Sequence, residues 1–85
     1  MNIVIAPEAR GQLSGLPKHI QKKAKRQFNF LLQDYRYPSL HSRKMSGLDL
    51  FEARIDLHYR FTFQIEGDVI YVFTVGPHDE GLGKK

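Results

Sequence analysis

Residues 51–66, FEARIDLHYRFTFQIE, decide the fold because hydrophobic side chains recur at every second position. The alternation runs from Phe51 to Leu57 and resumes from Tyr59 to Ile65. A period of two is typical of strands that bury one face and expose the other. The stretch therefore predicts two half-buried antiparallel strands joined by a short loop.

The register of these two strands follows from the same alternation. A three-residue loop at residues 56–58 places Ala53 opposite Phe61, so that the hydrophobic side chains of both strands share one face. A two-residue loop would mix hydrophobic and charged side chains on each face. With the three-residue loop, Arg54 is predicted to lie opposite Arg60 on the other face.

The flanking sequence predicts the remaining elements. Hydrophobic runs predict a strand at 3–5 and a last strand at 69–75, whose nearly continuous hydrophobicity is typical of a central strand buried on both faces. Helical spacing predicts a short helix at 7–16 and an amphipathic helix from 17 to about 35, and residues 36–49 have no clear period and are predicted to form a loop. The order β-α-α-β-β-β predicts an α+β fold, with a helical hairpin packed on one face of a small, mostly antiparallel four-stranded sheet.

Length and composition limit the class of protein. The 85 residues predict one domain, 1–85, with 79–85 as a mobile tail. The absence of cysteine excludes disulfides, thiolate metal sites and a cysteine nucleophile. No hydrophobic run reaches membrane-spanning length, so we expect a soluble, cytoplasmic protein without membrane contact. The formal net charge of +4 favours polyanionic partners.

The facing arginines allow two interpretations. Like charges directly opposite one another on a sheet cost roughly 0.2–1 kcal/mol, so either Glu52 and Asp56 pair with them on a solvated face, or Arg54 and Arg60 bind a phosphate. His78 follows the last strand and is expected near the same face, where an imidazole donates or accepts protons near neutral pH. This combination favours the phosphate site.

Residues 50–63, 67–68 and 75–80 together resemble toxins of the RelE/ParE superfamily. They show the same basic strand, the same strand with an aromatic residue before arginine, and the same Val-Gly-x-x-Asp end. The resemblance extends to Leu16-Pro17 at the start of the long helix and to the loop at 44–48, so it spans nearly the whole chain in order. It implies the RelE/ParE fold and the toxin of a toxin–antitoxin system.

The RelE branch of this superfamily implies an mRNA interferase, a ribosome-dependent endoribonuclease that inhibits translation. The ribose 2′-hydroxyl attacks the adjacent phosphate without a metal or other cofactor. The resemblance implies that Arg60 holds the phosphate, that Arg54 assists, that His78 is the general acid and that Glu52 is a candidate general base.

One departure from the active relatives concerns the C-terminus. Those relatives carry an aromatic residue there, whereas no aromatic residue follows Phe73. Catalysis could be weak, His41 or Tyr37 could substitute, or the fold could have lost its activity.

The basic residues outside the facing pair form two groups. Both are candidates for RNA binding, although for the helical group a solvated face is favoured over a dedicated RNA-binding role. The group in the predicted loop consists of His41, Arg43 and Lys44. The group in the long helix consists of Lys22, Lys25 and Arg26.

The resemblance leaves three functions open. The first is the ribosome-dependent endoribonuclease, with the ribosome and mRNA as partners. The second is a ParE-like inhibitor of DNA gyrase, and the third is a non-catalytic member that mainly binds its antitoxin. A cognate antitoxin protein is the expected partner in all three.

Overall fold

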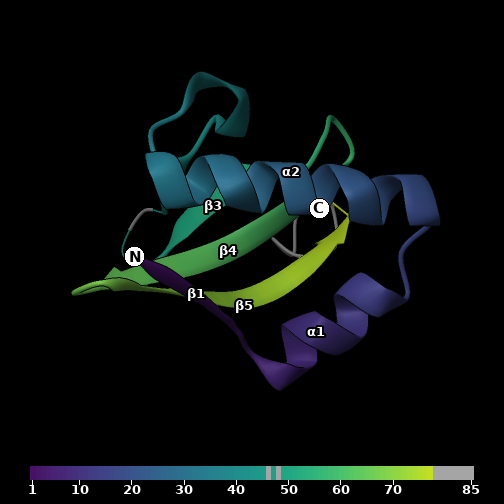
Figure 1. Ribbon diagram of the computed structural model, residues 1–85, viewed down its shortest axis with the longest axis horizontal. Coiled ribbons are helices and arrows are strands. Elements are labelled where there is room, and N and C mark those ends of the chain that lie inside the picture. The colour runs from purple at the N-terminus through teal and green to yellow at the C-terminus, as the bar shows by residue number, and fades with distance from the viewer. Residues whose placement is uncertain (46, 48, 78–85) are drawn as a thin grey trace.

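The computed structural model describes residues 1–45, 47 and 49–77, which form five strands, two α-helices and one 3₁₀ helix (Figure 1). In chain order they are β1 (Asn2–Ile5), α1 (Pro7–Ser14), α2 (Lys18–Gln33), η1 (Pro38–Leu40), β2 (Arg43–Lys44), β3 (Phe51–Arg54), β4 (Tyr59–Glu66) and β5 (Val69–Pro77). The predicted tail at 79–85 lies outside the described residues.

The strands form one sheet in the order β1-β5-β4-β3-β2. β1 pairs with β5 in parallel, and the other pairs are antiparallel. α2 lies across one face of this sheet, and α1 packs against β5 (Figure 1). The predicted α+β class, element order and mostly antiparallel sheet are therefore confirmed.

The predicted strand number is wrong, because the sheet has five strands rather than four. β2 lies within the segment predicted as a loop and pairs with β3 through Arg43 opposite Glu52 and Lys44 opposite Phe51. Its two residues are both exposed, so they show no hydrophobic alternation. This strand is defined by the pairing of its backbone with β3. Such pairing produces no periodic pattern of hydrophobic residues that could be detected in the sequence.

The register of β3 and β4 agrees with the prediction. Ala53 lies opposite Phe61 and Arg54 opposite Arg60. The regular strand ends at Arg54, and the Ile55 N–H still donates to the Tyr59 carbonyl over 2.9 Å. A loop of residues 56–58 thus joins the strands, as the alternation of hydrophobic residues requires.

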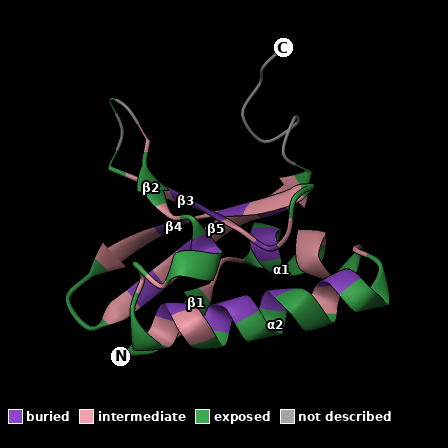
Figure 2. Ribbon diagram, turned by 90° about the horizontal axis from the view of Figure 1, so that it is seen from above, coloured by how far each residue is buried: buried purple, intermediate pink, exposed green. Residues whose placement is uncertain are grey.

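The core lies between α2 and the sheet (Figure 2). The predicted hydrophobic stripe of α2 is buried, and the ring of Phe28 meets that of Phe61 edge-on, with centroids 5.1 Å apart. Leu40 of η1 is also fully buried, although its segment was predicted to be a loop. The largest fully buried side chains are Phe61, Phe63, Leu31, Leu40, Ile70 and Val72.

β5 departs from the prediction that it is buried on both faces. Ile70 and Val72 are buried beneath α2, whereas Tyr71 and Phe73 are only half-buried. Both helices lie on the α2 side of the sheet (Figure 2), so in the described part of the chain no helix covers the other face of β5. We call the face of the sheet away from α2 the open face. Neither described helix is long and hydrophobic enough to cross a membrane.

Candidate functional site

A cleft of about 490 Å³ lies between α1 and strands β3 to β5. α1 is held beside β5 by Gln12, whose Oε1 accepts the Val75 N–H over 2.7 Å. The cleft combines two carboxylates, those of Glu8 and Glu52, with a guanidinium, two hydroxyls and the glycines of α1 and β5. Its lining includes Glu52, Arg60, Thr62, Thr74, Gly11, Gly15 and Gly76.

A polar row crosses the open face at the cleft. Arg43, Glu52, Thr62 and Thr74 lie opposite one another on β2, β3, β4 and β5 in turn. The Arg43 Nε donates to the Glu52 Oε1 over 3.3 Å, and the two threonine hydroxyls are 2.7 Å apart. The sheet register therefore places in one row side chains from Arg43 to Thr74, which are more than thirty positions apart in the sequence.

Glu52 has the most unusual environment in this row. It is only 4% exposed, and its Oε2 is buried with no hydrogen-bond partner in the described part of the chain. A buried carboxylate oxygen without a donor costs free energy, and native proteins rarely leave one without a functional reason. Glu52 lines the cleft, and its Oε2 is a buried acceptor without a donor among the described residues.

Arg54 and Arg60 form a second row, next to the first. They lie directly opposite one another, and the Arg60 Nη1 donates to the Asp56 and Leu57 carbonyls over 2.9 and 3.1 Å. Burial lowers the pKa of Arg60, the positive charge of Arg54 lowers it further, and Glu52 and Asp56 act in the opposite direction. Two cations held side by side make this part of the face attractive to an anion such as a phosphate.

Asp56 fixes the loop that carries Arg60. Its Oδ1 accepts the N–H groups of His58 and Tyr59 over 2.9 and 3.1 Å, and its Oδ2 lies 3.7 Å from the Lys23 Nζ of α2. Burial raises the pKa of Asp56, but the two N–H donors and Lys23 outweigh it, so that the pKa lies below the ordinary 3.8. The carboxylate form therefore favours the folded state.

This lowered pKa predicts a loss of stability in acid. The contribution of Asp56 is fully present above the ordinary pKa of 3.8 and is lost as the pH falls through the lower native pKa. Asp56→Asn should reduce the free energy of unfolding at pH 7 by about 1 kcal/mol and flatten its decline below pH 4. Urea unfolding between pH 2 and pH 7 measures both effects. An unchanged acid profile in the variant would contradict this role.

Gln27 positions the backbone of Arg54. This buried α2 side chain donates from Nε2 to the Arg54 carbonyl over 2.8 Å and to the Ser39 carbonyl over 3.1 Å, and its Oε1 accepts the Ser39 hydroxyl. It thereby ties β3 and η1 to the helix. The sequence analysis missed this residue, because a glutamine at a core position of a helix gives no local sign of its partners.

Removing the Gln27 amide should destabilise the protein. Gln27→Ala removes the donor from the partly buried hydrogen bonds to the Arg54 and Ser39 carbonyls, so we expect a loss of about 1–3 kcal/mol in the free energy of unfolding. Gln33→Ala is the matched control, since Gln33 is exposed at the end of the same helix. Urea unfolding of both variants tests this, and equal stabilities would show that the Gln27 hydrogen bonds contribute nothing.

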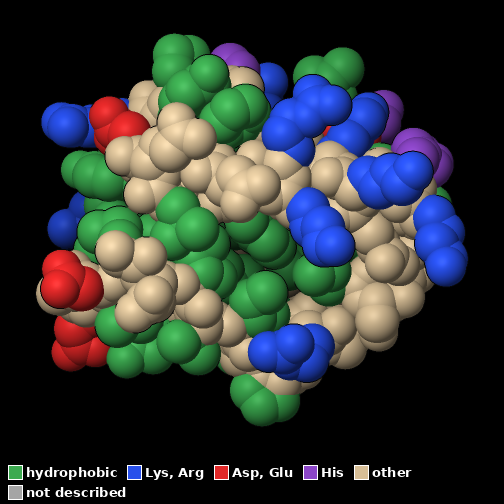
Figure 3. Space-filling model, viewed as in Figure 1, with side chains coloured by type: hydrophobic (Ala, Val, Ile, Leu, Met, Phe, Trp, Pro, Cys, Tyr) green, Lys and Arg blue, Asp and Glu red, His purple; other side chains and the backbone are tan. Residues whose placement is uncertain are grey.

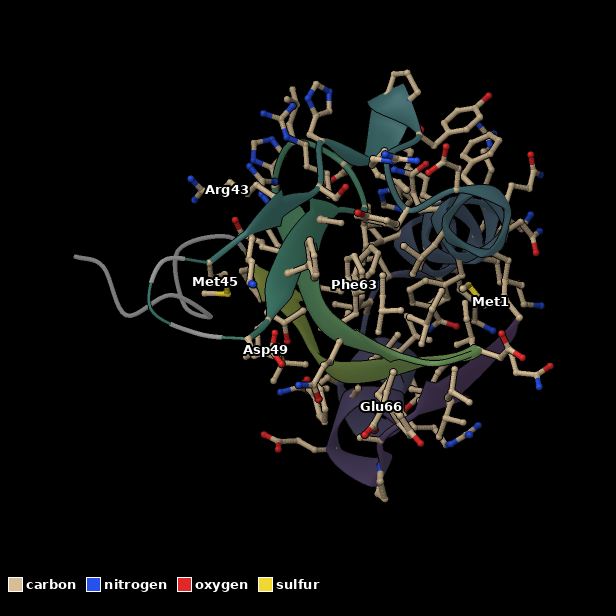
Figure 4. The ribbon with its side chains drawn as sticks, turned by 90° about the vertical axis from the view of Figure 1, so that its left-hand side faces the viewer. Met1, Arg43, Met45, Asp49, Phe63 and Glu66 are labelled. Carbon is tan, nitrogen blue, oxygen red and sulfur yellow. The ribbon has the colours of Figure 1, made fainter. Side chains whose placement is uncertain are left out.

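The predicted RNA-binding residues fall into two separate places. Arg43 projects from β2 on the side of the sheet away from α2 (Figure 4). Lys44 is the next residue of β2 and pairs with Phe51, so it belongs to the alternate face, and its Nζ lies 3.8 Å from Asp49. Exposed His41 is nearby in the sequence. The basic side chains of α2 are exposed over its N-terminal half (Figure 3), on the opposite side of the sheet from the arginine pair. They are Lys22, Lys25 and Arg26.

Two further expected site residues have different outcomes. His78 lies outside the described residues, so its predicted place beside the open face stays a prediction. The ring of Tyr37 stacks on that of Phe30 in α2, with the ring centroids 4.1 Å apart, so Tyr37 packs against the helix. The residues that the sequence analysis missed in the cleft are Gln12, Thr74 and the glycines, which only the contact between α1 and β5 brings to the site.

Comparison with solved structures identifies the fold. A YoeB/ParE toxin from Agrobacterium tumefaciens matches with a TM-score of 0.80 at 13% identity, over 92% of this chain and 99% of that one. The RelB–RelE antitoxin–toxin complex from Methanococcus jannaschii matches with a TM-score of 0.75 at 20% identity, over 94% and 95% of the two chains. The chain has the fold of the RelE and YoeB toxins. No family model and no curated protein sequence matches it.

The structural match to RelE and YoeB toxins confirms the resemblance to RelE/ParE toxins that was found in the sequence. The intact E. coli RelBE toxin–antitoxin complex also matches, with a TM-score of 0.72 at 19% identity, over 87% of this chain and 92% of that one. A YoeB–YefM complex from Staphylococcus aureus matches with a TM-score of 0.77 at 15% identity, over 92% and 97%. Several structures with this fold are thus toxins held by an antitoxin.

Proposed function

We propose that this protein is the toxin of a toxin–antitoxin pair and that it cleaves messenger RNA on the ribosome. One observation carries the proposal: Glu52, a buried carboxylate with one oxygen that has no partner among the described residues, lines the same cleft as Arg60, which faces Arg54. A general base next to paired cations is the arrangement that cleavage of RNA by its own 2′-hydroxyl requires.

The chemistry follows from these positions. Glu52 accepts the proton of a ribose 2′-hydroxyl, whose oxygen attacks the adjacent phosphorus. Arg60 and Arg54 stabilise the negative charge that develops on the phosphorane. The P–O5′ bond breaks, the 5′ oxygen takes a proton from the general acid, for which His78 is the candidate, and a 2′,3′-cyclic phosphate remains.

The surrounding basic residues supply non-specific attraction to RNA. Arg43 extends the cationic surface from the cleft onto β2, with Lys44 and His41 nearby in the sequence, and the exposed Lys22, Lys25 and Arg26 of α2 provide a second surface for ribosomal RNA. A cognate antitoxin would cover the cleft or its approaches and neutralise this positive charge.

Cleavage on arrested ribosomes tests the proposal. The purified protein is added to ribosomes stalled on a defined mRNA, and the cuts are mapped by primer extension. Cuts confined to the ribosomal A site are expected. If a well-folded protein makes no cuts, the ribonuclease proposal fails, and inhibition of gyrase supercoiling then separates a gyrase inhibitor from a protein that only binds its antitoxin.

A further inference from the structure

Three glycines line the cleft, and none of them is required by the conformation of the backbone. Gly11 and Gly15 belong to α1 and its C-terminal cap, and Gly76 belongs to β5. Among the described glycines, only Gly47 and Gly67 have the positive φ that favours glycine. The three glycines of the cleft have conformations that alanine adopts readily.

Packing within the chain does not require these glycines either. A Cβ atom added to Gly11 or Gly76 would meet no described heavy atom within 4 Å. At Gly15 the nearest atom would be the Gln12 carbonyl oxygen at 3.6 Å, which is an ordinary contact. Glycine also lowers the stability of a helix relative to alanine, so Gly11 carries a cost that no contact among the described residues explains.

Because these three glycines have no side chains, exposed backbone lines the cleft at their positions. We call Gly11, Gly15 and Gly76 the glycine wall. A glycine without a local structural reason often marks a place where a ligand approaches the backbone closely. Gly76 lies directly opposite Arg60 in the sheet, so its missing side chain leaves space beside that guanidinium.

Glu52 provides an independent sign that the cleft holds a ligand. Its buried Oε2 has no donor among the described residues, and Glu52 lines the same cleft as the glycine wall. The volume of about 490 Å³ is within the usual range for small-ligand sites. The ligand must therefore bring a hydrogen-bond donor to Glu52 and present a surface that packs closely on the backbone of α1.

We propose that the cleft seats one nucleoside of the RNA, with its ribose 2′-hydroxyl at Glu52 and its base packed against the glycine wall. The inference rests on the proposed ribonuclease function and adds to it a base-binding subsite on α1. A methyl group on the wall occupies the space of the base and displaces the ribose from Glu52, so cleavage should fall although the fold is intact.

Alanine substitution separates this role from a merely structural one. Gly11→Ala should raise the melting temperature by roughly 4 °C, because alanine favours the helix, and lower cleavage of ribosome-bound mRNA by about tenfold to a hundredfold. Asn29→Ala is the matched control, since it also raises helix propensity but exposed Asn29 lies on α2, outside the cleft lining. This control should cleave like the wild type.

A titration tests binding apart from catalysis. The probe is a 2′-O-methyl dinucleotide, which cannot be cleaved. The measurement is the change in the chemical shifts of backbone amides in ¹H–¹⁵N spectra when the probe is added. Shifts at Gly11, Gly15 and Gly76 are expected, with Gly67 of the β4–β5 turn unchanged.

The outcomes keep the two proposals distinguishable. If Gly11→Ala cleaves at the wild-type rate, the base-binding subsite is wrong and the ribonuclease function stands. If the wild type cuts no mRNA, the ribonuclease function fails and the titration alone decides: shifts confined to the glycine wall support a nucleoside site, and their absence overturns it.

Discussion

Arg60→Ala is expected to lower the rate of mRNA cleavage on the ribosome by about 10²–10³-fold. Arg60 lines the cleft, faces Arg54, and is held in place by the Asp56 and Leu57 carbonyls, so its charge is oriented before the substrate arrives. Preorganised charge of this kind stabilises the phosphorane without the cost of reorienting water. Single-turnover cleavage of a stalled ribosomal complex measures the rate.

Two controls make this result specific. Arg60→Ala also removes hydrogen bonds to the loop carbonyls, so its melting temperature must be compared with that of the wild type. Arg10→Ala removes the same charge from an exposed position on α1 that is outside the cleft lining, and it should leave the rate within about threefold of the wild type. A folded Arg60→Ala variant that cleaves normally, or that remains toxic through gyrase, would contradict the assignment.

Glu52→Gln is expected to lower cleavage by about 10²–10⁴-fold while the protein remains at least as stable as the wild type. The substitution keeps the shape of the side chain and an oxygen to accept the Arg43 Nε, but it removes the group that takes the proton. It also removes a buried charge whose Oε2 has no partner in the described chain, so the folded state loses little. Lower activity with undiminished stability is the signature of a residue retained for function.

The matched control for Glu52 is Glu66. Glu66 is exposed at the end of β4, so Glu66→Gln makes the same chemical change away from the cleft. Cleavage rates and melting temperatures of both variants are measured side by side. A Glu52→Gln protein that unfolds at a lower temperature in proportion to its lost activity would assign Glu52 a structural role instead.

The central part of the candidate site could be predicted from the sequence because it depends on local periodicity. Alternation along β3 and β4 and the length of the loop between them set the register, and the register brings Arg54 opposite Arg60 and Glu52 opposite Thr62. A slip by one residue would have exposed the hydrophobic side chains of one strand. Burial therefore allows only one pairing of the two strands.

The hydrogen bonds that support the site could not be predicted in the same way. Gln27 reaches across 27 positions to the Arg54 carbonyl, and Gln12 reaches across 63 positions to the Val75 N–H. A glutamine has no preferred partner that its neighbours in the sequence reveal. These contacts depend on how α1 and α2 dock on the sheet, which is decided by packing over the whole core.

The sequence by itself determined the α+β class, the order of the principal helices and strands, and the face that carries the arginine pair, because each depends on the spacing of hydrophobic residues along a few turns or strands. Only the tertiary structure decided that β2 joins the sheet, that one oxygen of Glu52 is buried without a donor from residues 1–45, 47 or 49–77, and that the glycines of α1 line one cleft together with Gly76. The reason is physical. Periodicity reports which side of an element is buried, whereas a site between elements depends on contacts between residues far apart in the chain.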